Sequence, residues 1–223
     1  MKKGLHKYFL YYTRENWNLY KRKIFWFLII ILALTPEIPF AQNLDVDILK
    51  AINPVNPNSV YWEQTSTSAY WVPGFIVLGS LGYGFLEKNK QIKQNGYELL
   101  INIAVSQLIS EALKISINRE RPADKYPTEI FASSPTHGGS FPSGHTSLAF
   151  ATATTIALDY KKWYIVVPAY LWAGSVAYSR MYLGVHYPSD VLGGIIIGIG
   201  SGYLSHWLTK KLFKDKNNTH VHP

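Results

Sequence analysis

The sequence predicts an all-α integral membrane protein, a bundle of five or six transmembrane helices. Of its 223 residues, 48% are hydrophobic and only 16% are charged, whereas about 25% are charged in an ordinary soluble domain. Residues 64–86 include no charged side chain and are numerous enough to cross a bilayer. The basic residues also lie mainly on alternate connections between apolar segments. Because the chain has no cysteine, a disulfide scaffold and a thiolate metal site are excluded.

The N-terminal segment has the order of charge and apolarity found in a secretory signal peptide. Basic residues precede an apolar run at 24–34, which is short for a membrane span, and the small residue Ala41 follows where a signal peptidase could cut. We therefore expect residues 1–41 to be a signal peptide or a retained N-terminal anchor. Residues 42–64 are then an extracytoplasmic segment.

Four further helices are expected after the uncharged stretch. The first has helical periodicity with polar residues on one face, so it should pack against other helices. The second is rich in threonine, and the third and fourth are strongly apolar. The fourth has several glycines at spacings that let membrane helices approach closely. Their expected ranges are 97–117, 146–158, 163–178 and 191–208.

The distribution of charge predicts how the chain is oriented. Sixteen of the 22 Lys and Arg residues fall at the N-terminus, on two inter-helix connections and at the C-terminus, all on one side of the expected bundle. The positive-inside rule makes that side cytoplasmic and leaves residues 209–223, including His220 and His222, as a basic cytoplasmic tail. A nucleic-acid-binding protein would have its basic residues gathered into one patch with exposed aromatic side chains. Here they are distributed among separate helix ends, so that function class is excluded.

Some of the basic residues expected outside stand in a chemically suggestive pattern. Lys114 and Arg121 are seven positions apart, which places both on one helix face if the helix continues to the residue before Pro122. A third cation, Arg180, ends a later helix. Glu111 stands one turn before Lys114 and is expected to form a salt bridge with it.

Two histidines and a helix start complete the candidate site. Ser143, Gly144 and His145 open a helix whose free backbone N–H groups suit an anion, and glycine allows close approach. His186 and Asp190 stand four apart at the start of the last helix, so the carboxylate can hold the imidazole. Singly, such features are common at ordinary helix ends, but together on one predicted face they suit phosphate chemistry.

These residues resemble three known signature motifs. Lys114-x6-Arg121-Pro122, Pro142-Ser143-Gly144-His145 and Ser179-Arg180-x5-His186-x3-Asp190 are similar to those of the type 2 phosphatidic acid phosphatase (PAP2) family. That family shares its site with vanadium haloperoxidases and bacterial class A acid phosphatases. The resemblance covers roughly residues 65–208, which we take as the phosphatase domain, and every motif position matches.

The residue types and the resemblance imply the same mechanism. His186 is the expected nucleophile, Asp190 fixes its tautomer, and His145 is the general acid. Five further residues would bind the phosphate oxygens: Lys114, Arg121, Ser143, Gly144 and Arg180. Three fixed cations replace the usual magnesium, so we expect no metal or other cofactor in the reaction.

The expected substrate is a phosphorylated membrane lipid, since the site would lie at the outer surface of a bilayer. Phosphatidic acid, phosphatidylglycerol phosphate, lipid A and undecaprenyl diphosphate all qualify, and the loop at 123–140, with His137, would select among them. The expected location is a bacterial inner membrane, with the site facing the periplasm and no obligate protein partner. Three alternatives stay open: a soluble periplasmic acid phosphatase, a vanadium-dependent haloperoxidase, and an inactive lipid-binding or transport protein.

Overall fold

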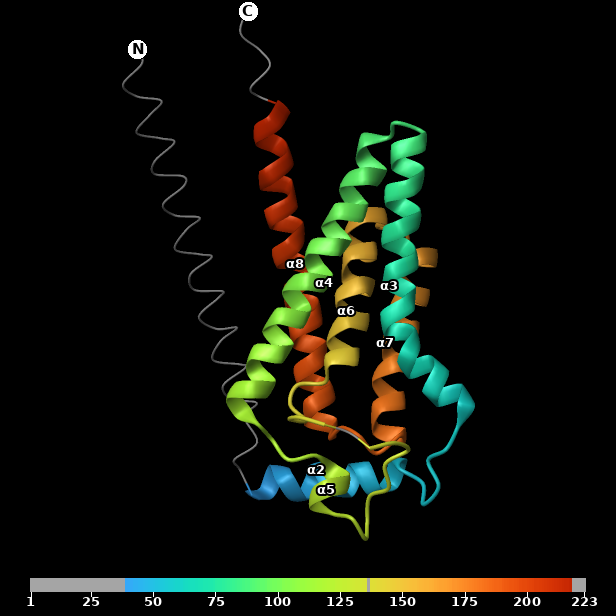
Figure 1. The fold of residues 1–223 in the computed structure, drawn as a ribbon, viewed down its shortest axis with the longest axis vertical. Helices are drawn as coiled ribbons and strands as arrows, with labels where there is room; N and C mark the ends of the chain where they lie inside the picture. Colours follow the sequence, from blue (N-terminus) through green and yellow to red (C-terminus); the bar gives the residue numbers. More distant parts are fainter. Residues whose placement is uncertain (1–38, 136, 218–223) are drawn as a thin grey trace, which may run out of the picture. The chain divides into compact units, whose positions relative to one another are not determined.

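The computed structural model describes residues 39–135 and 137–217, in which every regular element is a helix. This confirms the all-α prediction. The chain divides into two compact units, 1–39 and 40–223, and the account below concerns the second. The predicted signal peptide or anchor and the two tail histidines lie outside the described residues. Figure 1 shows the helices in order: α2 (Pro39–Ile52), α3 (Val60–Leu86), α4 (Lys90–Ile117), α5 (Pro122–Lys125), α6 (Gly144–Tyr160), α7 (Trp163–Tyr182) and α8 (Pro188–Asn217).

Three described segments are long and apolar enough to cross a membrane: Val60–Leu86, Lys90–Lys125 and Pro188–Phe213. The remaining two long helices depart from this pattern for identifiable reasons. Most of α6, with its threonines, is buried between its neighbours, so lipid does not select its side chains. In α7, tryptophan and tyrosine lower the hydropathy. The five predicted helices of the bundle are therefore present, and three of them are both long and apolar enough to cross a membrane.

Helix α4 ends at Ile117, where the sequence pattern predicted its end, and begins earlier than predicted, at Lys90. Asn118 adopts the left-handed conformation, with φ of 44°, and its N–H donates to the Lys114 carbonyl at 2.9 Å, which closes the helix after Ile117. Arg121 follows in an extended conformation as the N-cap of α5. The condition under which Lys114 and Arg121 would share a helix face, a helix that continues to the residue before Pro122, is therefore not met, although both residues lie at the same end of the bundle.

Close packing of α8 on α6 fixes the centre of the bundle. A Cβ atom at Gly194 would lie 2.6 Å from the carbonyl oxygen of Ser143, and one at Gly198 would lie 2.4 Å from that of Ser147. Neither contact is possible, so only glycine lets the two backbones approach this closely, as the small-residue spacing predicted. A cluster of small buried side chains joins α6 to α3 and α7: Ala69, Ala149, Ala153, Ala173 and Val176.

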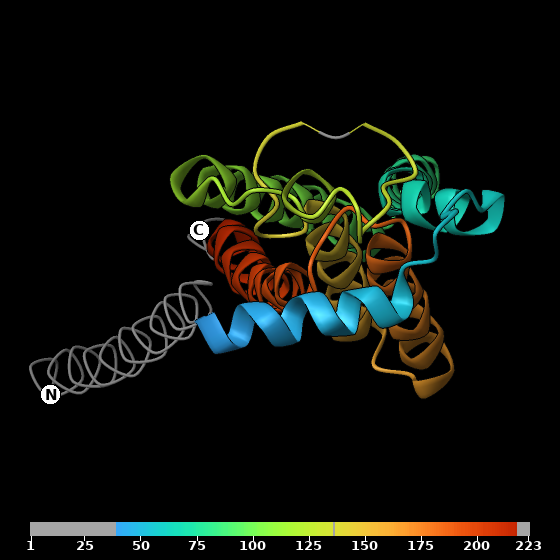
Figure 2. The same ribbon diagram turned by 90° about the horizontal axis from the view of Figure 1, so that it is seen from below.

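The segment expected to be extracytoplasmic contains a helix that the sequence did not reveal. Figures 1 and 2 show α2 lying across one end of the bundle, beside the α5 segment. Its Val46 and Leu49 pack against Ile130 and Tyr187. Asn53, just after α2, donates to the carbonyl oxygens of Phe131 at 2.9 Å and Tyr182 at 2.8 Å. These contacts fix α2 to the loop that follows α5 and to the end of α7.

We predict that Gly198→Ala destabilises the bundle by about 1–3 kcal/mol, because the new methyl group overlaps the α6 backbone. Gly174→Ala is the matched control, since nothing lies within 4 Å of a Cβ at that helical position. Thermal unfolding of both variants in detergent measures the difference. Equal melting temperatures would contradict the packing described above.

Candidate active site

The motif residues gather where α4 ends and where α6 and α8 begin. Lys114 lies in the last turn of α4, Gly144 and His145 open α6, and α8 begins at Pro188, three residues before its expected start. Ser143 connects two of these helix ends directly, because its N–H donates to the carbonyl of Asp190 at 3.0 Å. The site is thus a junction of helix termini.

Lys114 is held against the start of α6. Its Nζ lies 2.7 Å from Glu111 Oε1, which confirms the predicted salt bridge. The same Nζ would lie 3.3 Å from a Cβ at Gly144, so the glycine leaves space for the ammonium group beside the helix N-terminus. This arrangement places a cation and free backbone N–H groups side by side, the features that favour an anion.

The two arginines are held differently. Arg121 is buried and donates to three loop carbonyls: Gly138 at 3.1 Å, Val185 at 3.0 Å and His137 at 3.1 Å. It therefore holds loops together with part of its guanidinium, a function the sequence did not indicate. Arg180 donates to the Ser66 hydroxyl of α3 through Nη1, while its buried Nε has no hydrogen-bond partner among the described residues. An unpartnered guanidinium N–H is suited to an anionic oxygen.

His145 lies amid these charges. Lys114, Arg121, Arg180 and the His186 ring all interact with it electrostatically. Its ring packs edge-on against Tyr70 of α3, with centroids 4.6 Å apart, and Nδ1 lies 3.5 Å from the Tyr70 hydroxyl. Both predicted histidines and all three predicted cations are thus close enough to interact electrostatically around His145.

His186 is a buried histidine in the loop between α7 and α8, with 2% of its surface exposed. Its Nδ1 lies 3.4 Å from Asp190 Oδ2, which is long for a hydrogen bond. Such contacts often shorten only when substrate binds. Burial lowers the pKa of His186 to about 4, although the Asp190 carboxylate opposes the shift. The imidazole is consequently neutral at ordinary pH, the state a nucleophile requires.

Arg119 is a residue of this site that sequence reasoning left unassigned. Its Nη1 donates to Asp190 Oδ1 at 2.5 Å, and its Nη2 donates to Asp45 Oδ2 of α2 at 2.8 Å. The guanidinium also lies 3.8 Å from the centre of the Tyr187 ring. Ser189 joins this network, with its N–H donating to Asp45 Oδ1 at 2.9 Å. Arg119 therefore links α2 to the carboxylate that faces His186.

Sequence signals for these extra residues were weak. Arg119 stands two positions before Arg121, outside the three motifs, and no spacing relates it to Asp190. Asp45 lies far away in the chain, in the expected extracytoplasmic segment, for which no helix was predicted. Tyr70 and Ser66 stood within the uncharged stretch, where nothing separated them from other polar residues of a membrane span.

Comparison with known proteins places the chain in a family. Residues 96–214, more than half of the sequence, match the model of the PAP2 superfamily. The chain belongs to that superfamily, as its three motifs suggested. The match begins after α3, so it covers a shorter range than the 65–208 domain expected from the motifs, and it ends slightly later.

Three curated relatives are membrane lipid phosphatases by name. The chain is 27% identical to the lipid A 4'-phosphatase of Bacteroides thetaiotaomicron over 187 residues, covering 78% of this chain and 81% of that protein. It is 27% identical to the undecaprenyl-diphosphatase of Sulfolobus acidocaldarius, covering 82% and 91%. It is 29% identical to phosphatidylglycerophosphatase B of Bacillus subtilis, covering 81% and 91%.

Two solved structures share the fold. Aquifex aeolicus LpxE superposes with a TM-score of 0.59 at 29% identity, covering 74% of this chain and 95% of that one. The transmembrane PAP2-type phosphatidylglycerolphosphate phosphatase of Bacillus subtilis gives 0.64 at 25% identity, covering 84% and 94%. Together with the apolar helices, these likenesses establish a membrane protein of the phosphatase class.

We predict that Arg119→Gln lowers kcat by about 10–100-fold with little change in KM, because Arg119 orients Asp190 without reaching the phosphate. Arg119→Lys should recover only part of the rate, since an ammonium cannot bridge two carboxylates as a guanidinium does. Lys50→Ala is the control, because it removes an exposed ion pair to Glu129 near the same end of the bundle. A rise in KM with unchanged kcat would mean that Arg119 binds substrate instead.

Proposed function

We propose that this protein is a metal-independent lipid phosphate phosphatase that hydrolyses a phosphomonoester or diphosphate of a membrane lipid through a phosphohistidine intermediate. The observation that carries the proposal is the junction of helix ends. There a buried neutral histidine faces a fixed carboxylate, close to a second histidine, three cations and a helix N-terminus. The lipid phosphatase names of the relatives support the same substrate class.

In the proposed reaction, His186 Nε2 attacks phosphorus and the bond to the leaving lipid oxygen breaks. Asp190 accepts the Nδ1–H, holds the ring in the reactive tautomer and stabilises the imidazolium as it forms. Asp190 is prepared for this task because Arg119 and the Tyr187 N–H, the latter at 2.9 Å, hold its two oxygens. Water then attacks the phosphohistidine and returns His186 to its neutral form.

His145 is the proposed general acid and base. It donates a proton to the departing oxygen and afterwards takes one from the attacking water. Lys114, Arg121 and Arg180, with Ser143 and the Gly144 N–H, would stabilise the negative charge on the phosphoryl oxygens. Arg180 supports this assignment best, since its buried Nε has no hydrogen-bond partner among the described residues. Fixed cations perform here the charge neutralisation that many phosphatases leave to a metal ion.

The substrate is proposed to approach from the outer leaflet of a bacterial inner membrane. Basic residues cluster toward the far ends of α3, α4, α6 and α8, away from the motifs, which favours a cytoplasmic position for those ends. The motif end, with α2 across it, would then face the periplasm. Phosphatidic acid, phosphatidylglycerol phosphate, lipid A and undecaprenyl diphosphate remain the candidate substrates.

Phosphate release from each of these four lipids in detergent tests the proposal. We predict turnover of at least one in the presence of EDTA, and a loss of about 10⁴-fold or more in His186→Ala. Thermal unfolding shows whether the variant is folded. Retained turnover in a folded His186→Ala protein would contradict the mechanism. Release from soluble phosphate esters alone would favour an acid phosphatase, and bromide oxidation with added vanadate would favour a haloperoxidase.

A further inference from the structure

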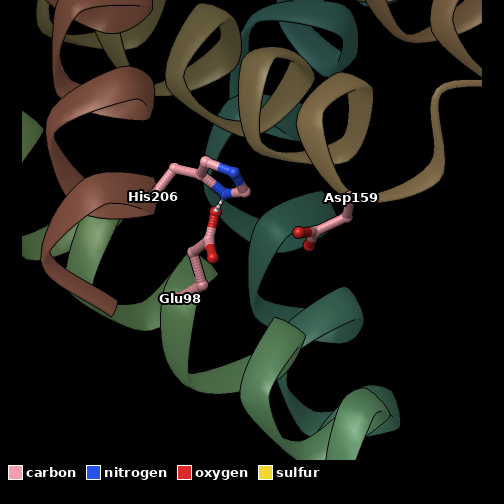
Figure 3. A group of neighbouring side chains, drawn as sticks. All are labelled: Glu98, Asp159 and His206. Carbon is pink, nitrogen blue, oxygen red and sulfur yellow. Dashed lines mark hydrogen bonds and ion pairs between the residues drawn. The ribbon is translucent and has the colours of Figure 1, made fainter. Parts of the chain in front are cut away.

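A second group of titratable side chains lies far from the candidate active site. Glu98 of α4, Asp159 of α6 and His206 of α8 converge toward the end of the bundle opposite the motifs (Figure 3), and we call them the distal triad. Their ligand-type atoms all lie within 4.8 Å of one another. At a rise of about 1.5 Å per residue, the triad lies roughly 20–24 Å along its helices from the active-site residues Lys114, His145 and Asp190.

A layer of contacts one helical turn away brings these three helices into register. Asn102 Nδ2 of α4 donates to Thr155 Oγ1 of α6 at 2.5 Å. The same nitrogen would lie 3.6 Å from a Cβ at Gly202 of α8. Each member of the distal triad stands four positions beyond one of these three residues, toward the same end of the bundle. The convergence of the triad therefore follows from backbone packing and not from chance side-chain rotamers.

The triad concentrates negative charge inside the protein. Glu98 is 4% exposed, and its Oε1 lies 2.6 Å from Nδ1 of His206. Asp159 and Glu98 repel one another electrostatically, and Lys210 partly offsets this repulsion. In Figure 3 the Asp159 carboxylate is directed toward the other two members. Two carboxylates this close within a membrane bundle are costly unless a cation binds them.

The donor set suits a particular class of cation. Imidazole nitrogen and carboxylate oxygen are both ligands that zinc accepts, at about 2.0–2.2 Å from the metal. The ligand atoms around one such ion are about 3.3 Å apart. Side-chain rotations that move the ligand atoms by about 1–2 Å would bring the three residues to that separation. The side chain of His206 is 19% exposed, which leaves an open edge for entry.

Two buried hydroxyls of α8 stand close to His206 in the sequence. Ser205 Oγ and Thr209 Oγ1, on the turns of α8 around His206, have no hydrogen-bond partner among the described residues. Water bound to a cation would supply the missing hydrogen bonds. We propose that the distal triad binds a divalent transition-metal ion, Zn²⁺ by preference, which joins α4, α6 and α8 at this end of the bundle and takes no part in phosphate hydrolysis.

Zinc binding to the detergent-purified, tag-free full chain tests the proposal. Titration calorimetry and elemental analysis with ZnCl₂ should give one site that weakens by about 10–100-fold or more in Glu98→Gln, Asp159→Asn and His206→Gln. Asp159→Asn is the mildest change, because that side chain has no hydrogen bond to lose among the described residues. Glu87→Gln is the matched control, since Glu87 is an exposed carboxylate at the same end of the bundle.

The histidines of the C-terminal tail are present in every variant, so any zinc they bind cancels in the comparison. Zinc should also raise the melting temperature of the unaltered protein and of Glu87→Gln but not of the triad variants. Thermal unfolding of each triad variant without zinc shows whether it is folded. Equal zinc uptake by the unaltered protein and Asp159→Asn, or no uptake by either, would overturn the proposal. Failure of the phosphatase assay would leave this binding result unaffected.

Discussion

The buried carboxylate of Asp190 is the constraint on which the arrangement of the site depends. It is fully buried, so each of its oxygens needs a partner. Arg119 binds one oxygen and the Tyr187 N–H binds the other. The backbone carbonyl of Asp190 accepts from Ser143, the residue that opens α6. One residue therefore ties together the end of α4, the start of α6 and the start of α8.

Charge compensation extends this network beyond the motifs. Arg119 stands between Asp190 and Asp45, so α2 helps to neutralise a cation that would otherwise be buried with a single partner. The remaining cations, Lys114, Arg121 and Arg180, share only Glu111 as a close acidic partner among the described residues. The site thus has a local excess of positive charge, which is the electrostatic condition for binding a phosphate.

Packing explains how helices so rich in small residues can hold charged groups precisely. Gly194 and Gly198 let the backbone of α8 approach α6, and that approach places His186 beside the start of α6. Membrane helices gain little from burying apolar surface against one another, so close backbone contact and internal hydrogen bonds must provide their specificity. The threonines of α6, unusual for a lipid-facing helix, are buried and hydrogen-bond within the helix.

Much of this could be predicted from the sequence, and the exceptions share a cause. The helices of the bundle and the motif residues were predictable because apolar length, charge placement and fixed spacing are local signals. The end of α4 at Ile117 agrees with its periodicity, but the left-handed conformation of Asn118, which follows it, depends on one residue and has no signal in that periodicity. The contacts of Arg119 with Asp45, and the convergence of the distal triad, join positions far apart in the chain, for which a single sequence contains no spacing signal.

The measurement that tests the account most directly is identification of the phosphorylated residue during turnover. Rapid acid-free quenching of the enzyme with a ³²P-labelled lipid phosphate, followed by peptide mass spectrometry, would trap the intermediate. The account predicts a phosphoryl group on His186. Label on another residue, or its complete absence during confirmed turnover, would contradict it.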